Sequence, residues 1–216
     1  MKKLSLVISV YNEEAVLEKF YNAFCNIEQD LKYGGENELI FVNDGSTDAS
    51  MNILEVIAQQ NKNVRVISFS RNFGHEAAMI AGIDHAAGDV IICMDADLQH
   101  PLECIAPIMA KFEEGYEVIS MVRTSNKSAG AIKNFTSRAF YRVINALSDQ
   151  VKLEENASDF FAISSRVADV LRTNYREKTR FLRGYVQSVG FRKTTLEYTA
   201  AERAGGASHY TLKKLM

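Results

Sequence analysis

Short apolar runs alternate with longer, more polar segments through the first 122 residues, and this alternation restricts the fold more than any other feature of the chain. The runs are typical of strands and lie at Leu4–Val10, Leu39–Val42, Val64–Phe69, Val90–Met94 and Glu117–Val122. The segments between them are long enough to be helices. Strands that alternate with helices form βαβ units with right-handed connections. We therefore predict an α/β fold with a Rossmann-like, mostly parallel sheet flanked by helices.

Capping residues and a proline indicate where two of the helices begin. Asn12 suits the N-cap of a first helix that runs to about Leu31. Glu13 and Glu14 would fall in its first turn, where the helix dipole favours acidic side chains. Pro101 suits the first turn of a later helix that ends near residue 114.

The rhythm changes after residue 122, so we expect one domain made of two different halves, 1–122 and 123–216. The second half would be a C-terminal extension with a polar linker at 123–130, helices at 135–147, 167–171 and 180–189, strands at 159–163 and 191–198, and a glycine-rich basic loop at 203–209. Residues 211–216 look like the start of a helix that is cut short, which suggests that the natural protein continues beyond them.

Composition excludes several classes of protein. A formal charge of −2 gives no sign of a surface for a polyanion, so no nucleic-acid partner is expected. The three cysteines are odd in number and lack metal-ligand spacing, which is typical of reduced thiols in the cytosol. The sequence has no run of about 18 apolar residues that could span a membrane. It also lacks the glycine-rich loops of dinucleotide-binding and P-loop proteins.

The fourth apolar run leads directly into two aspartates, Asp95 and Asp97, with only Ala96 between them. Ligands of open α/β sheets bind at the carboxyl ends of the strands. Two carboxylates at such an end form a set of hard oxygen ligands that suits Mg²⁺ or Mn²⁺ holding a diphosphate. The alternative is an exposed acidic turn, which is what an isolated Asp-x-Asp most often forms.

Acidic side chains also follow other strands, with Glu13 after the first, and Asp44 and Asp48 after the second. The carboxyl ends of parallel strands meet at one edge of a sheet, so these carboxylates are expected to converge. Like charges held together need a cation or hydrogen-bond donors, and a nucleotide diphosphate with a divalent metal supplies both. Turn formation and helix capping are the alternative, favoured for Asp48, whereas ligand contact is favoured for Asp44.

Several segments, in order along the chain, resemble a known family. They are Ser9–Glu14, Val42–Asp48, Asn72–Met79, Gly88–Asp89, Met94–Pro101, Thr136–Tyr141, Asp159–Phe160, Arg180–Gly184 and Arg203–Ser208. Together they look like the inverting family 2 glycosyltransferases with a GT-A fold. The closest resemblance is to bacterial polyprenyl-phosphate hexose synthases, relatives of dolichol-phosphate mannose synthase, and it covers nearly the whole chain.

The resemblance implies which residues hold the donor. Those expected to contact the nucleotide sugar are Tyr11, Glu13, Val42, Asp44, Asp95, Ala96, Asp97, Arg123 and Arg203. Those expected at the Mg²⁺ or Mn²⁺ ion are Asp95, Asp97 and Gln99. The two arginines would contact phosphates, because a guanidinium donates a fork of hydrogen bonds that matches them.

Asp159 matches the catalytic acidic position of the family. A phosphate monoester acceptor is largely ionised at neutral pH, since its second pKa is about 6. Asp159 would then orient the acceptor or tune its charge. A sugar hydroxyl acceptor would instead require Asp159 as a general base. The residues themselves leave both roles open.

The chain departs from the family pattern at five positions. Ser9 stands where proline is usual, and Asn43 where an aspartate is usual. Phe161, Ser188 and His209 replace an arginine, a tryptophan and a lysine. These last three fall in the half that is expected to bind the acceptor.

The resemblance implies a metal-dependent glycosyltransferase that moves a hexose, as glucose from UDP-glucose, to polyprenyl phosphate with inversion. The alternatives are transfer to a sugar hydroxyl of a cell-surface glycan and a non-catalytic nucleotide-sugar-binding module. Basic, amphipathic segments at 130–150 and 205–216 favour contact with a membrane surface, although a core helix suits the first equally well. The natural protein would then work at the cytoplasmic face of the cell membrane, and assembly into a homo-oligomer is compatible with this role.

Overall fold

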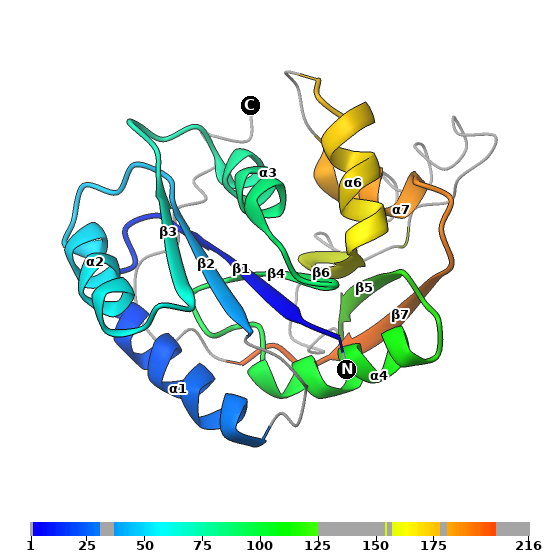
Figure 1. Ribbon diagram of the computed structural model, residues 1–216, viewed down its shortest axis with the longest axis horizontal. Helices are drawn as coiled ribbons and strands as arrows, with labels where there is room; N and C mark the ends of the chain where they lie inside the picture. The colour runs from blue at the N-terminus through cyan, green and yellow to red at the C-terminus, as the bar shows by residue number, and fades with distance from the viewer. Residues whose placement is uncertain (1, 31–36, 125–153, 155–156, 178–180, 202–216) are drawn as a thin grey trace, which may run out of the picture.

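Seven strands form one sheet in the part of the chain that the computed structural model describes, residues 2–30, 37–124, 154, 157–177 and 181–201 (Figure 1). The strands are β1 (Leu4–Val10), β2 (Glu38–Asn43), β3 (Val64–Ser68), β4 (Val90–Asp95), β5 (Val118–Arg123), β6 (Ala157–Ser164) and β7 (Lys193–Tyr198). Their order across the sheet is β3-β2-β1-β4-β6-β5-β7. The predicted α/β fold is confirmed, and each expected strand matches an observed one to within about two residues at either end.

Helices follow most of the strands. They are α1 (Leu17–Asp30), α2 (Ser50–Gln60), α3 (His75–His85), α4 (Ile105–Glu113), α6 (Ser165–Asn174) and α7 (Leu182–Ser188), with a short 3₁₀ helix, η1 (Leu102–Cys104), before α4. The helix expected from Pro101 thus begins with a 3₁₀ turn. Among the described residues, no helix has the length and apolar character needed to cross a bilayer. The expected linker from residue 125 on, the helix at 135–147 and everything expected from residue 203 on lie outside them.

The predicted start of the first helix at Asn12 is wrong, because the residues after β1 bind the loop after β2. Asn12 adopts a left-handed φ of 55°, and its side-chain oxygen accepts a hydrogen bond from the Thr47 N–H at 2.8 Å. The Glu14 N–H donates to Asp48 Oδ2 at 3.2 Å. Asn12, Glu13 and Glu14 therefore precede α1 instead of capping it, and Asp48 has the turn role that was favoured for it.

Within the sheet only β6 is reversed, and it lies between β4 and β5, pairing antiparallel with both. Its register sets Cys93 opposite Phe161. Asp159 precedes Phe161 by two residues and Asp95 follows Cys93 by two, so both lie just beyond this pair at the same edge of the sheet. Side chains alternate along a strand, so both acids lie on the face that Cys93 and Phe161 share. Two carboxylates far apart in the sequence are thereby brought to one edge of the sheet.

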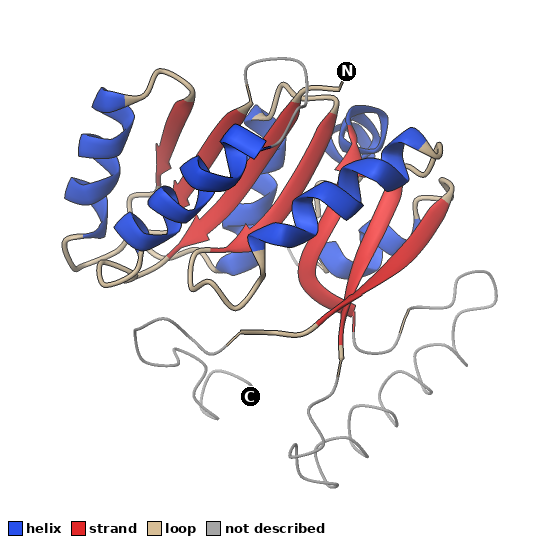
Figure 2. Ribbon diagram, turned by 90° about the horizontal axis from the view of Figure 1, so that it is seen from below, coloured by secondary structure: helices blue, strands red, loops and turns tan. Residues whose placement is uncertain are grey.

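Helices cover both faces of the sheet, which gives three layers (Figure 2). On one face, α1, α2 and α4 enclose a core that includes Phe20, Phe41 and Phe112. On the other face, α3, α6 and α7 pack over a core that includes Val42 and Phe161 (Figure 1). The central strands β1, β2 and β4 are buried on both faces, so their sequences are nearly continuous apolar runs.

A buried carboxylate links β2 to its neighbours at the edge of the sheet opposite the two acids. Glu38 accepts hydrogen bonds from Ser5 Oγ and from the Ala87 N–H at 2.7 Å, and Arg65 Nη1 lies 3.4 Å from its second oxygen. The Gly88 N–H donates to Ser5 Oγ at 2.7 Å, at a place where a Cβ would collide with Ser5. Burial alone would raise the pKa of Glu38, but these donors lower it below its usual value.

We expect Glu38→Gln to lower the free energy of unfolding at pH 7 by about 1.5–3 kcal/mol, since hydrogen bonds to a charged acceptor are lost. The pKa of Glu38 is lower in the folded chain than the unfolded value of about 4.3. The stabilisation is therefore present above that pH and is lost as the pH falls through the folded pKa. Urea unfolding at pH 7 and near pH 3.5 measures both values. If the stability lost in Glu38→Gln is the same at both pH values, the stabilising role of the Glu38 carboxylate is contradicted. The control is Glu55→Gln at an exposed position, which should change the free energy of unfolding by less than about 0.5 kcal/mol.

Candidate active site

The loop after β4 is closed by hydrogen bonds between its own residues. The Gln99 N–H donates to Asp97 Oδ1 at 3.0 Å, and Leu98 between them has a left-handed φ of 62°. The Asp95 N–H donates to His100 Nδ1 at 3.1 Å. Side-chain acceptors for backbone donors are what fix a tight polar turn, so the two aspartates are held in a defined loop.

His100 fastens this loop to the strands of the second half. Its buried ring stacks on Phe160 of β6 with centroids 4.9 Å apart and meets Tyr198 of β7 edge-on at 5.7 Å. Burial lowers the pKa of His100. Because Nδ1 accepts a backbone hydrogen bond, the ring proton belongs on Nε2. His100 is therefore a neutral structural anchor.

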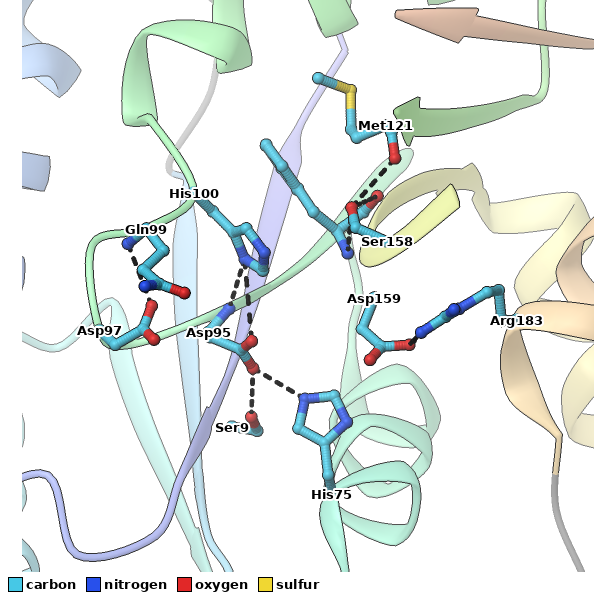
Figure 3. A network of polar contacts seen from close by, with 11 residues as sticks. Ser9, His75, Asp95, Asp97, Gln99, His100, Met121, Ser158, Asp159 and Arg183 are labelled. Carbon is cyan, nitrogen blue, oxygen red and sulfur yellow. Dashed lines mark hydrogen bonds and ion pairs between the residues drawn. The ribbon is translucent and has the colours of Figure 1, made fainter. Parts of the chain in front are cut away.

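Asp95 receives hydrogen bonds from two different elements (Figure 3). Its Oδ1 accepts from Ser9 Oγ of β1 at 3.0 Å and pairs with His75 Nε2, at the start of α3, at 2.7 Å. Burial would raise the pKa of Asp95, but the hydrogen bond and charge of His75, with the Ser9 hydroxyl, hold it well below its usual range. The carboxylate is therefore ionised and able to bind a cation.

His75 carries the balancing positive charge. Burial alone would lower the pKa of His75, but the hydrogen bond and charge of Asp95, with the charges of Asp159 and Glu76, raise it to about 9. At neutral pH the ring is an imidazolium, and its bond to Asp95 is charge-assisted. In Figure 3 His75 projects from α3 toward the ends of β4 and β6.

Asp159 of β6 is paired with an arginine from α7. Arg183 donates to Asp159 Oδ1 twice, from Nη2 at 2.7 Å and from Nε at 3.2 Å. The side chain of Asp159 is 33% exposed and that of Arg183 is 29% exposed, so the pair borders solvent. Figure 3 shows Asp159 on the same side of the strands as Asp95 and His75. The structure thus brings the expected catalytic acid beside the expected metal loop.

Asp44 follows β2, and its buried carboxylate binds the backbone just before α3. Its Oδ1 accepts from the Phe73 N–H at 2.6 Å and its Oδ2 from the Gly74 N–H at 3.0 Å. The carboxylate therefore pairs the N–H groups of the N-cap residue Gly74 and of the residue before it, and its negative charge lies favourably at the N-terminus of α3. These hydrogen bonds fix the start of α3, from which His75 projects. Contact of Asp44 with a nucleotide stays a prediction.

The other residues expected around the base, ribose and diphosphate lie at the ends of β1, β2 and β4. Glu13 is buried, and its N–H donates to Ser50 Oγ at 2.9 Å. Tyr11 is half-buried just after β1. Val42 is 0% exposed within β2 and Ala96 is 1% exposed in the loop after β4, so their contact with a nucleotide stays a prediction.

The two phosphate-binding arginines differ in what the structure describes. Arg123 is exposed at the last residue of β5, on the edge of the sheet where Asp95 ends β4. Arg203 lies outside the described residues. The Ala201 N–H, however, donates to the Gln99 carbonyl at 3.3 Å, so the chain just before Arg203 runs beside the loop after β4.

The donor set at this loop fits a magnesium-type ion that is completed by a ligand. Asp95 and Asp97 would provide carboxylate oxygens and Gln99 an amide oxygen. In the described part of the chain, no cluster of three or more His, Cys, Asp or Glu side chains could hold a metal by itself. Mg²⁺ commonly binds one or two carboxylates together with waters and substrate phosphates. Two aspartates without a full protein cage agree with that pattern.

Four of the five departures from the family pattern fall on described residues, and all four are accommodated locally. Ser9 supplies the hydrogen bond to Asp95, which a proline side chain lacks. Asn43 accepts from a backbone N–H of its own loop. Phe161 is buried in the core, and the Ser188 hydroxyl donates to a carbonyl of its own helix.

Sequence reasoning assigned no site role to Ser9, His75, His100 or Arg183. All four stand inside segments that carried the family resemblance, and that position was the one signal available. Their partners come from other elements of the sheet, so no local spacing indicated the pairs.

A family model described as Glycosyl transferase family 2 matches residues 5–172. The chain therefore belongs to glycosyl transferase family 2. It is 41% identical over 213 residues to the uncharacterized glycosyltransferase YkcC of Bacillus subtilis (strain 168), covering 98% of this chain and 64% of that protein. It is 37% identical over 213 residues to the bactoprenol glucosyl transferase of Shigella phage SfV, covering 99% of this chain and 68% of that protein. The chain thus spans about two thirds of these relatives.

The fold is shared with a solved glycosyltransferase. The structure of glucosyl-3-phosphoglycerate synthase from Mycobacterium tuberculosis in complex with Mn²⁺, UDP-glucose and phosphoglyceric acid matches with a TM-score of 0.62. The match covers 99% of this chain and 74% of that chain at 17% identity. At this identity the likeness shows the fold, and the GT-A fold expected from the sequence is confirmed.

We expect Asp44→Asn to destabilise the chain by about 1–3 kcal/mol, because an amide NH₂ placed against two backbone N–H groups leaves one of them unsatisfied. The free energy of unfolding from urea titration measures the loss. Asp169→Asn is the matched control, since Asp169 pairs with Arg172 on the surface and should cost less than about 0.5 kcal/mol. Equal effects of the two changes would show that Asp44 does not fix the start of α3.

Proposed function

We propose that the chain is the catalytic part of an inverting glycosyltransferase that moves a hexose from a nucleotide diphosphate sugar to a lipid phosphate. The observation that carries the proposal is the placement of Asp159 beside the Asp95 loop through the β4–β6 pairing. One carboxylate set can hold the leaving diphosphate, while a separate carboxylate faces the carbon that is attacked. A module that only binds a nucleotide sugar would not need this separate carboxylate.

The donor would bind at the carboxyl ends of β1, β2 and β4. Asp95, Asp97 and Gln99 would hold Mg²⁺ or Mn²⁺, and when bound this ion would neutralise charge on the leaving diphosphate. The M. tuberculosis enzyme of the same fold was solved with Mn²⁺ and UDP-glucose, which supports this choice. Arg123 and Arg203 would contact the phosphates.

The nucleoside would lie over the ends of β1 and β2. Tyr11, Glu13, Val42, Asp44 and Ala96 would surround this position. The buried acids Glu13 and Asp44 favour contacts with N–H and O–H donors of a base and a ribose. UDP-glucose is the donor that we expect.

The acceptor is expected to be polyprenyl phosphate. A relative that is 37% identical is named a bactoprenol glucosyl transferase, which supports both glucose and a polyprenyl acceptor. An acceptor of this kind would bring the full-length protein to the cytoplasmic face of the membrane. That location, and any assembly of several copies, stay predictions.

The residues of the chain would divide the reaction between them. His75 and Ser9 keep Asp95 ionised and fixed, so the site is formed before the donor arrives. Asp159 would stabilise positive charge at the anomeric carbon as its bond to the diphosphate breaks. Attack from the side of β6, opposite the leaving group, gives inversion.

UDP with Mn²⁺ should raise the melting temperature of the chain by about 5–10 °C at a hundredfold excess over Kd, because a ligand that binds only the folded state stabilises it. Asp97→Ala should abolish the Mn²⁺-dependent part of the shift and the metal-dependent hydrolysis of UDP-glucose. The surface variant Asp169→Ala should keep both. A full shift in Asp97→Ala would exclude the loop after β4 as the metal site.

We expect transfer of glucose from UDP-glucose to a short-chain prenyl phosphate, and none to free sugars or to the matching prenyl alcohol. A thin-layer or mass-spectrometric assay of labelled product measures this. The product should be the β-glucoside, because inversion changes the α-configuration of the donor. Glucosylation of sugars in preference to the prenyl phosphate would contradict the proposed acceptor.

A further inference from the structure

The side chain of His100 joins the loop after β4 to two strands of the second half. Its Nδ1 accepts a hydrogen bond from the Asp95 N–H at 3.1 Å (Figure 3). Its ring stacks on Phe160 of β6, with centroids 4.9 Å apart and planes inclined by 23°, and meets Tyr198 of β7 edge-on at 5.7 Å. His100 is buried, so water competes little with either contact. One side chain thus holds the loop through two different kinds of interaction.

The hydrogen bond of His100 closes the loop that carries the expected metal ligands. It joins the two ends of the loop, since Asp95 is the last residue of β4 and residues 96–99 lie between it and His100. Inside the loop, the Gln99 N–H donates to Asp97 Oδ1 at 3.0 Å. All three expected ligands lie at or between the joined ends, so a change in the His100 hydrogen bond would change their relative positions.

The two aromatic partners of His100 each lie beside another residue of the site. Phe160 directly follows Asp159, and successive side chains of a strand point to opposite faces. The Phe160 ring therefore lies in the core behind the sheet, while Asp159 is on the face of the site. Tyr198 lies opposite Arg123 in the pairing of β7 with β5, and its ring meets that of Phe160 at 5.4 Å. The His100 ring is thereby tied to the expected catalytic acid and to an expected phosphate contact.

His100 is not placed to bind the metal itself. The single lone pair of Nδ1 is engaged by the Asp95 N–H, and the proton of the neutral ring is then on Nε2. Nδ1 also lies 4.0 Å from Asp95 Oδ2, so the ring is behind the carboxylate pair and outside the set of oxygen ligands. Its role must therefore be exerted through the residues that it contacts.

We propose that His100 is a positioning residue with two separable tasks: its Nδ1 sets the shape of the metal-binding loop, and its ring sets the place of that loop relative to Asp159. This inference rests on the proposed function and adds a residue to its machinery. The first task determines metal affinity, because groups that orient metal ligands commonly contribute about 10–100-fold to it. The second determines the rate of transfer, because a displacement of about 1 Å at a reacting centre can cost about 10²-fold.

Two substitutions separate the tasks. In His100→Asn the amide Oδ1 is as many bonds from Cα as Nδ1 was, so an acceptor for the Asp95 N–H is kept while the ring is lost. In His100→Phe the ring is kept, but it offers no acceptor to that N–H. A purely structural His100 would not distinguish metal affinity from turnover, because destabilisation lowers the folded fraction and reduces both together.

Titration with Mn²⁺ in the presence of saturating UDP tests the first task, with free Mn²⁺ measured by electron paramagnetic resonance. His100→Phe should weaken Mn²⁺ binding by about 10–100-fold, and His100→Asn by less than about threefold. Wild-type affinity for Mn²⁺ in His100→Phe would overturn the inference.

Transfer of glucose from UDP-glucose to a short-chain prenyl phosphate, at saturating Mn²⁺, tests the second task. The value of kcat should fall by about 10–100-fold in His100→Asn and by less than about threefold in His100→Phe. Phe160→Leu removes the stacked ring without changing the loop, so it should repeat the loss of kcat at wild-type Mn²⁺ affinity even if His100→Asn fails to fold. Losses of affinity and kcat that run in parallel in these variants would overturn the inference.

Phe112→Leu is the matched control for loss of a core ring. Phe112 is buried in the same core as Phe160, but its carbonyl accepts a hydrogen bond from Lys2 Nζ at 2.8 Å, before the start of β1 and thus at the opposite edge of the sheet. Phe112→Leu should lower the melting temperature as Phe160→Leu does and leave Mn²⁺ affinity and kcat unchanged. An equal loss of kcat in Phe112→Leu would attribute the effect to general destabilisation and overturn the inference.

The proposed function and this inference fail in different ways. If the wild-type chain binds Mn²⁺ with UDP but transfers no glucose to the prenyl phosphate, the proposed function fails, and the Mn²⁺ titrations still decide whether His100 shapes the loop. If the wild-type chain transfers glucose but His100→Asn and His100→Phe behave alike in both measurements, the inference alone is overturned.

Discussion

The antiparallel pairing of β6 with β4 is the constraint on which the candidate site depends. β6 comes from the second half of the chain, yet it lies between two strands of the first half. Its pairing with β4 brings Asp159 to the same edge of the sheet as Asp95 and, through alternation, to the same face. A shift by one residue would turn Asp159 toward α4 and leave the metal loop without a neighbour. Backbone hydrogen bonds and core packing at Cys93 and Phe161 therefore determine the chemistry that the edge can support.

Bringing acids together in this way creates a charge problem, which the helices on that face resolve. α3 presents His75 to Asp95, and α7 presents Arg183 to Asp159. Asp44 in turn accepts hydrogen bonds from the two N–H groups that immediately precede α3, so one buried carboxylate sets the position of the imidazolium. Asp95 and Asp159 thus each have a cation of their own before any ligand binds. A site arranged in advance of the reaction loses little energy in reorganisation, which is the main way in which charged groups assist catalysis.

The sequence was most informative where local rules decide the outcome. Buried strands such as β1 and β4 are continuous apolar runs, and their ends could be predicted to within a residue or two. The predicted start of the first helix was wrong because Asn12 and Glu14 form hydrogen bonds with the loop after β2, which is distant in the sequence. The pairs that involve His75 and Arg183 depend on strand order, which no periodicity reveals. The family resemblance identified Asp95, Asp97 and Asp159, but it gave neither their spatial relation nor their counter-charges.

The central claim is that the loop after β4 binds the metal and diphosphate of the donor beside Asp159. Anomalous scattering from Mn²⁺ in crystals grown with UDP tests it most directly, because it locates the ion without assumptions about the protein. We predict one strong peak within about 2.0–2.3 Å of carboxylate oxygens of Asp95 or Asp97 and of the diphosphate, with Asp159 facing the open side of the ion. A peak bound elsewhere, or UDP seated without any contact to this loop, would contradict it.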